Sequence, residues 1–218
     1  MTRPIEPIRL GPGPEFDLIR QFLARAKEGA SQTGDSVQVG PGDDCAVVDG
    51  IALSTDLSVE GIHFRREWLE PREIGYRAAA AALSDLAAVA ARPIGILCSL
   101  ACAGDDAAAL APRVMDGLRS AASGVGAVLL GGDLARSPGP LVIDVVAIGR
   151  ADSPVLRSGA RPGDVLWVTG ELGGAAAAVL AWQGGATPAE GAREAFARPR
   201  PRIREALWLA ERGIVHAM

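Results

Sequence analysis

Acidic residues stand in four short blocks, and each block adjoins small residues and an apolar run. Carboxylates that fold together from distant parts of a chain repel one another unless a cation lies among them. Mg²⁺ prefers oxygen ligands and commonly holds substrate phosphates as well. The pattern therefore indicates a site for a Mg²⁺-nucleotide, and its blocks are Gly42-Asp43-Asp44, Ser54-Thr55-Asp56, Ser84-Asp85 and Gly131-Gly132-Asp133.

Two of these blocks fall within elements that should fix their side chains. On a strand, Ser54 and Asp56 share a face, and Thr55 can offer its backbone oxygen, so the block supplies adjacent oxygen ligands at a strand end. The alternative is a polar strand end at which Asp56 caps a turn. Asp85 falls in an alanine-rich helical run, where a carboxylate is costly without a partner. Its alternative is a helix side that faces solvent.

The glycine-containing blocks read as turns near phosphate. Glycines let the backbone approach a phosphate, and Asp133 can bind the metal ion that bridges to that phosphate. The block that contains Asp44 is predicted to be a turn, which would direct the Asp44 carboxylate away from the backbone. An exposed hairpin turn is the alternative for Asp44. The sequence has no Gly-Lys-Ser/Thr, and Lys27 is its only lysine, so arginine and metal must offset the phosphate charge. Arg157 is the best candidate, with Arg136 second.

His63 follows a strand end, so it can touch a substrate or else face solvent as an ordinary loop histidine. The formal net charge of −4 does not indicate a positively charged surface of the kind that binds nucleic acid, and it argues against nucleic acid as the main partner. We expect no disulfide framework, since the cysteines are three and read as small buried hydrophobes. We also expect no signal peptide and no membrane span, and hence a cytoplasmic protein.

The periodicity predicts an α+β fold, with a mixed or antiparallel sheet and helices on one face. We expect a flexible arm over 1–14, an N-terminal domain over 15–149 and the start of a second, α/β domain over 150–218. That second unit offers one strand and two helices, which is too little sheet for a complete α/β domain. The predicted helices are 15–26, 71–91, 107–123, one opening at 173–174 and 202–212, and the predicted strands are 46–48, 51–55, 94–102, 125–130, 141–148 and 165–169.

With these blocks in order, the chain from Glu15 onward resembles the thiamine-monophosphate kinase family. That family belongs to a superfamily with aminoimidazole ribonucleotide synthetase and selenophosphate synthetase. The resemblance implies transfer of the ATP γ-phosphate to thiamine monophosphate, giving thiamine diphosphate. It rests on Gly42-Asp43-Asp44-Cys45-Ala46, Ser54-Thr55-Asp56, Glu60-Gly61-Ile62-His63-Phe64, Leu83-Ser84-Asp85-Leu86-Ala87-Ala88, Gly131-Gly132-Asp133 and the run from Arg157 to Asp164.

The resemblance also implies roles for single residues. Several Mg²⁺ ions would serve as cofactors, and no side chain is assigned as an acid or base, because phosphoryl transfer needs mainly positioning and charge neutralisation. The family's homodimers pair their N-terminal sheets into a barrel, with ATP near that interface. The implied Mg²⁺ ligands are Asp44, Ser54, Thr55, Asp56, Asp85 and Asp133, the implied ATP contacts are Gly132, Asp133 and Arg157, and the implied substrate contact is His63.

The chain also departs from the family pattern. Ala82 stands where the family has asparagine, and we expect the chain to lack a C-terminal part with a further Asp-x-Ser-Asp-Gly block. One alternative is thus a nucleotide-binding or dimerisation module without turnover. Another is a different ATP-using member of the superfamily, such as a selenophosphate synthetase. The cysteine or selenocysteine and the lysine of that family are absent before Glu15.

Overall fold

The computed structural model describes residues 14–26 and 36–218, so the predicted arm falls almost wholly outside the described residues. The described helices are α1 Pro14–Ala26, α2 Pro71–Ala88, α3 Gly104–Gly124, α4 Gly174–Gln183, α5 Glu190–Ala197 and α6 Ile203–Glu211. The described strands are β1 Val37–Val39, β2 Ala46–Val48, β3 Ile51–Val59, β4 Arg92–Cys102, β5 Val128–Arg136 and β6 Val142–Arg150, with a short 3₁₀ turn at Arg157–Gly159.

The strands form one mixed sheet in the order β1-β2-β3-β6-β4-β5. Every neighbouring pair is antiparallel except β4 and β5, which are parallel. A parallel pair requires a crossover, and α3 supplies it between these two strands. The predicted α+β class is therefore confirmed, with a mixed sheet at its centre.

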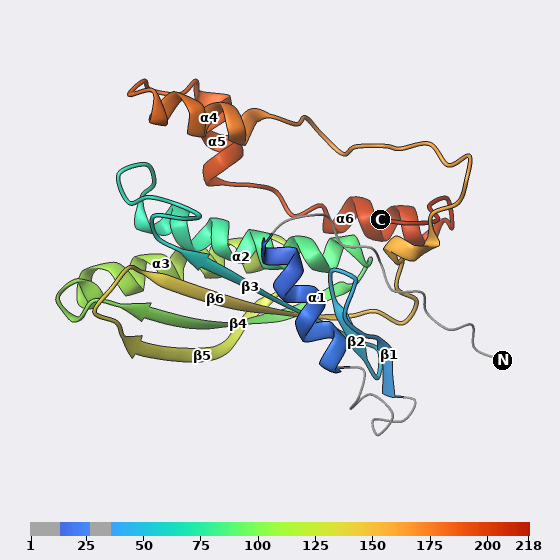
Figure 1. Ribbon diagram of the computed structural model, residues 1–218. Coiled ribbons are helices and arrows are strands. Elements are labelled where there is room, and N and C mark those ends of the chain that lie inside the picture. The colour runs from blue at the N-terminus through green and yellow to red at the C-terminus, as the bar shows by residue number, and fades with distance from the viewer. Residues whose placement is uncertain (1–13, 27–35) are drawn as a thin grey trace.

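Helices α2 and α3 cover one face of this sheet (Figure 1). Two glycines allow the pair to pack closely. A Cβ on Gly75 would lie 1.9 Å from the Val114 carbonyl oxygen, and a Cβ on Gly117 would lie 1.9 Å from the Arg72 carbonyl oxygen. Only a residue without a side chain fits at such a contact. The close approach positions α2, and with it Asp85, against the strands.

The strands alternate between a covered face and an open one. Ile143 and Val145 on β6 are fully buried under the helices. On β3, Leu53 and Leu57 point to the opposite side and are 36% and 50% exposed. We call the side of the sheet that carries Leu53, Thr55, Leu57 and their β6 neighbour Asp144 the open face.

The structure corrects the prediction for the second unit. Residues 165–169 form no strand, and in 151–218, all of which are described, no strand is present at all. An extended segment becomes a strand only beside another strand, and here Val165, Leu166 and Trp167 are 74%, 96% and 88% exposed. The unit contains three helices instead of two, because α5 was not predicted. The division of the chain at 149 and 150 stays a prediction.

Two predicted strands are also longer than expected. β3 runs on to Val59 and β5 on to Arg136, so Asp56 and the block Gly131-Gly132-Asp133 lie within strands and not at their ends. The three cysteines are free and buried, as predicted. Among the described residues, no helix is both long and apolar enough to span a membrane. The cytoplasmic location stays a prediction.

Candidate functional site

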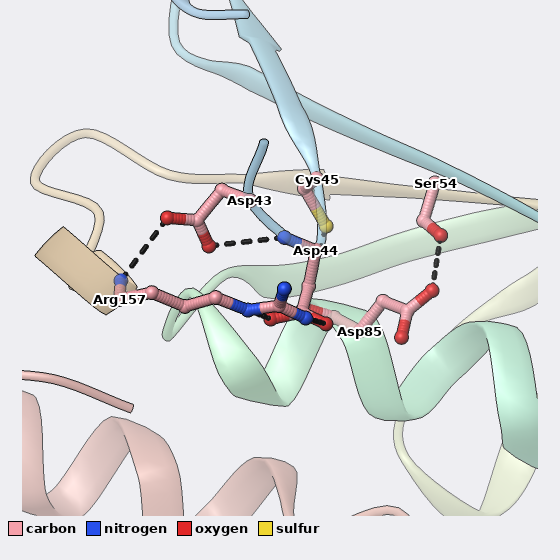
Figure 2. Close-up of polar contacts among 6 residues, drawn as sticks. All are labelled: Asp43, Asp44, Cys45, Ser54, Asp85 and Arg157. Carbon is pink, nitrogen blue, oxygen red and sulfur yellow. Dashed lines mark hydrogen bonds and ion pairs between the residues drawn. The ribbon is translucent and has the colours of Figure 1, made fainter. Parts of the chain in front are cut away.

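The loop before β2 meets the turn after β6 through an ion pair (Figure 2). The Arg157 Nε donates to Asp44 Oδ2 at 2.8 Å, and its Nη2 donates to the other oxygen of the same carboxylate. The backbone N–H of Arg157 also donates to Asp43 Oδ2 at 3.0 Å. The side-chain bonds to Asp44 raise the pKa of Arg157 above its ordinary value. A fork-to-fork contact of this kind fixes the guanidinium in one orientation.

Asp85 on α2 finds the partner that its burial requires. The Ser54 hydroxyl donates to Asp85 Oδ2 (Figure 2). Burial raises the pKa of Asp85 to about 6, and the bond from Ser54 opposes that rise. The charges of Asp44 and Asp56 raise the pKa further, whereas Arg157 lowers it. Three carboxylates from three elements therefore influence one another here.

Asp56 lies on the same side of β3 as Ser54, as the strand alternation predicts. Burial raises its pKa, the charges of His63 and Arg77 lower it, and Asp144 raises it. His63 itself is exposed, and its ring Nδ1 accepts a hydrogen bond from the Val59 N–H at 3.1 Å. The histidine is thus held in the turn that follows Val59, the last residue of β3.

Sequence reasoning missed the part played by Asp43 and Cys45. Asp43 accepts the N–H of Asp44 at 3.0 Å as well as that of Arg157, so it holds the loop and the turn together. The Cys45 thiol donates to the Asp85 carbonyl oxygen at 3.3 Å, and burial raises the pKa of that thiol to about 12. The adjacency of Asp43 to Asp44 was the available signal.

Asp133 and Gly132 do not join this group. They lie on β5, an edge strand that pairs only with β4, and both are exposed. Asp133 lines a hollow of about 110 Å³ with Ser99 and Asp144 on the open face. Thr55 also points to that face, and its hydroxyl donates to Asp144 Oδ1 at 2.8 Å. The predicted ligand residues thus form two groups, one on each face of the sheet.

The donors fit a metal that substrate helps to hold. The structure describes the side chains of His, Cys, Asp and Glu residues in 36–218, except those of residues 105 and 106. Among these described side chains, no three lie close enough together to bind an ion unaided. Mg²⁺, however, commonly takes only one or two carboxylates and completes its shell with water and phosphate oxygens. Asp44 and Asp85 are carboxylates of that kind. Burial is the main cause of the raised pKa of Asp85, and the negative charges of Asp44 and Asp56, which a cation would offset, raise it further.

A larger hollow of about 840 Å³ adjoins the group. Arg157 and Ser84 line one part of it, and Trp167, Arg202 and His216 line others. Neither Asp44 nor Asp85 lines this hollow. The hollow adjoins their carboxylates only through Arg157, which pairs with Asp44, and Ser84, which precedes Asp85 in the sequence.

The comparison with known proteins decides the family. The family of the AIR synthase related protein, N-terminal domain, matches residues 42–151, which is half of the chain and includes β2 to β6. The chain belongs to this family. All of the predicted metal-binding residues fall within the matched region, and they are Asp44, Ser54, Thr55, Asp56, Asp85 and Asp133.

Individual relatives are similar over a greater length. The thiamine-monophosphate kinase of Mycobacterium tuberculosis is 38% identical over 177 residues, which are 78% of this chain and 51% of that protein. The crystal structure of thiamine-monophosphate kinase from Stenotrophomonas maltophilia K279a is 33% identical with a TM-score of 0.67, covering 94% of this chain and 66% of that one. The structure of AaThiL complexed with AMPPCP and TMP is 26% identical with a TM-score of 0.74, covering 89% and 62%. The chain thus spans about half the length of the first of these relatives.

Proposed function

We propose that this chain takes part in the ATP- and Mg²⁺-dependent phosphorylation of thiamine monophosphate to thiamine diphosphate. The observation that carries the proposal is the meeting of Asp44, Asp85 and Arg157 from a loop, a helix and a turn within the matched family domain and just beyond it. The names of the relatives support the kinase reaction, and the neighbour complexed with AMPPCP, an ATP analogue, and TMP supports the pair of substrates.

The chain's own residues supply positioning and charge. Arg157 is already fixed by Asp44, so its remaining N–H groups can meet a phosphate with little further loss of side-chain freedom. Asp44 and Asp85 would hold Mg²⁺, with the Ser54 hydroxyl orienting the Asp85 carboxylate. When bound, Mg²⁺ neutralises phosphate charge and polarises the transferred phosphoryl group. His63, exposed in the turn after β3, is the proposed substrate contact.

We also propose that the protein is a homodimer that pairs through the open face. The exposed Leu53 and Leu57 on β3 support this, because a partner sheet would bury them. Asp133 and its neighbour Asp144 lie on the same face. Asp133 would then belong to the interface, near which the family resemblance puts ATP.

The test is formation of thiamine diphosphate from ATP, Mg²⁺ and thiamine monophosphate, followed by liquid chromatography. Asp44→Asn is expected to lower turnover about a hundredfold or more, since it removes charge stabilisation at the transferred group. Asp116→Asn is the matched control, because Asp116 is exposed on α3 and pairs only with Arg119 on its own helix at 3.2 Å among the contacts of the described residues. Equal turnover in wild type and Asp44→Asn would overturn the proposal. Retained Mg²⁺-ATP binding without turnover in the wild type would favour a nucleotide-binding module.

A further inference from the structure

The segment 213–218, which follows α6, lies against the turn that carries Arg157 (Figure 1). Arg157 begins this 3₁₀ turn and Gly159 ends it. A Cβ on Gly159 would lie 1.9 Å from the His216 carbonyl oxygen, so the two backbones are in direct contact. A residue with a side chain does not fit at so close an approach. The backbone of His216 therefore limits where the Arg157 turn can lie.

The His216 side chain holds the next turn of the same loop. Its ring Nδ1 lies 2.8 Å from Asp164 Oδ1, and Asp164 Oδ2 accepts the N–H of Arg161 at 2.7 Å. The N–H of Arg161 and the bond with His216 lower the pKa of Asp164 below its ordinary value. An ionised carboxylate only accepts hydrogen bonds, so the His216 Nδ1 is the donor. One histidine thus contacts both turns of the loop 157–164.

Arg157 is therefore held at two places along its turn. At the start of the turn, Asp43 accepts the Arg157 backbone N–H at 3.0 Å and Asp44 accepts the guanidinium. At the end of the turn, Gly159 lies against His216. Arg157 and His216 also line the same hollow of about 840 Å³. The carboxylates fix the charged group of Arg157, and His216 fixes the backbone that follows it.

We propose that His216 is a positioning residue of the Mg²⁺-nucleotide site, which holds the loop 157–164 so that the Arg157 guanidinium can meet phosphate. The inference rests on the proposed function. His216 acts through the loop and not by touching the phosphate. Without its ring, the turn 161–164 loses one of its two carboxylate bonds, and nucleotide binding must order a looser loop. Ordering a loop on binding lowers affinity.

Calorimetric titration with AMPPCP in the presence of Mg²⁺ tests this role. His216→Ala is expected to weaken binding about threefold, which is the scale of one exposed hydrogen bond between charged groups. His216→Asn is expected to bind like the wild type, because its amide N–H stands at the same place along the side chain as Nδ1. Arg92→Met is the matched control, since it breaks an exposed 2.6 Å ion pair between β4 and Glu211 of α6. It is expected to leave the affinity unchanged.

A double-mutant cycle with Arg157→Met determines whether His216 acts through Arg157. In the Arg157→Met background, His216→Ala is expected to cause no further loss of AMPPCP affinity, because the group that it positions is gone. An equal loss in both backgrounds would overturn the inference. A His216→Asn variant that binds as weakly as His216→Ala would also overturn it.

Gly159→Ala tests the same contact from the other side, and it keeps the inference testable if circular dichroism reveals that His216→Ala does not fold. The added methyl group would overlap the His216 carbonyl oxygen and push the two segments apart. This variant is expected to weaken AMPPCP binding about threefold or more. Gly191→Ala on α5 is its control, since a Cβ there would meet nothing within 4 Å. Equal affinities for these two glycine variants would contradict the role of His216.

Arg157→Met separates this inference from the proposed function. If Arg157→Met leaves AMPPCP binding unchanged, then the proposed site itself is contradicted. If Arg157→Met weakens binding while neither His216→Ala nor Gly159→Ala does so, then only the role of His216 fails.

Discussion

The guanidinium of Arg157 forms a bidentate ion pair with the carboxylate of Asp44, although the two residues are 113 positions apart in the chain. The Nε–Oδ2 distance is 2.8 Å, and the Arg157 N–H is held in addition by Asp43. One bidentate contact thus joins the loop that opens the matched family domain to the turn that follows the last strand of the sheet. This contact places the Arg157 guanidinium, which we propose to bind phosphate, beside the Asp44 carboxylate, which we propose to bind Mg²⁺.

Arg157→Met should weaken binding of AMPPCP in the presence of Mg²⁺ about ten- to a hundredfold, since it removes a charge-assisted donor to phosphate. The variant should lose no more than about 1 kcal/mol of unfolding free energy, because exposed ion pairs contribute little to stability. Calorimetric titration and urea unfolding measure the two quantities. Arg92→Met is the control, as it breaks an exposed pair with Glu211 at 2.6 Å. An equal loss of affinity in both variants would contradict the assignment of Arg157.

Asp85→Asn should change how stability depends on pH. Burial raises the pKa of Asp85 from 3.8 to about 6 in the folded protein. The folded state therefore binds the proton more tightly than the unfolded state. The stability that this gives the wild type is fully present below about pH 4 and is lost as the pH rises through about 6. Between pH 4 and pH 7, the unfolding free energy of the wild type should therefore decrease by about 1–2 kcal/mol relative to that of Asp85→Asn, after allowance for solvent screening.

Urea unfolding of both proteins between pH 4 and pH 7 measures this difference. A gap between wild type and Asp85→Asn that stays constant over the range would mean that Asp85 titrates normally. Ser54→Ala is a useful companion variant, because the Ser54 hydroxyl lowers the pKa of Asp85. Its loss should move the pH-dependent range upward.

Gly75→Ala should destabilise the protein by about 1–3 kcal/mol, because the added methyl group would overlap the backbone of α3. The new Cβ would lie 1.9 Å from the Val114 carbonyl oxygen, and backbone cannot move aside as a side chain does. Gly124→Ala, at the end of α3, is the matched control, since its Cβ would meet nothing within 4 Å. Urea unfolding compares the two, and similar unfolding free energies for both variants would mean that α2 and α3 do not pack this closely.

Local patterns predicted much of the candidate site. Strand alternation put Ser54 and Asp56 on one side of β3, and the cost of burying a carboxylate called for a partner of Asp85, which is Ser54. The α+β class and the helix-covered face followed from hydrophobic periodicity. These features depend on neighbours in the sequence or on burial alone, so they can be predicted from a single sequence.

The remaining features depend on contacts between distant residues. Nothing near Arg157 in the sequence predicts that it pairs with Asp44, 113 positions away. The separation of Asp133 from Asp85 follows from strand order, because β5 lies at the edge of the sheet. The apolar run 165–169 failed as a strand prediction for a related reason: the strand pattern is local, whereas the partner strand is not.

Calorimetric titration with AMPPCP, with and without Mg²⁺, tests the central claim that Asp44, Asp85 and Arg157 form a Mg²⁺-nucleotide site. We expect binding that requires Mg²⁺, that is lost or strongly weakened in Asp85→Asn, and that is retained in Asp116→Asn. Binding of equal strength in EDTA and in Mg²⁺, unchanged by Asp85→Asn, would contradict the account.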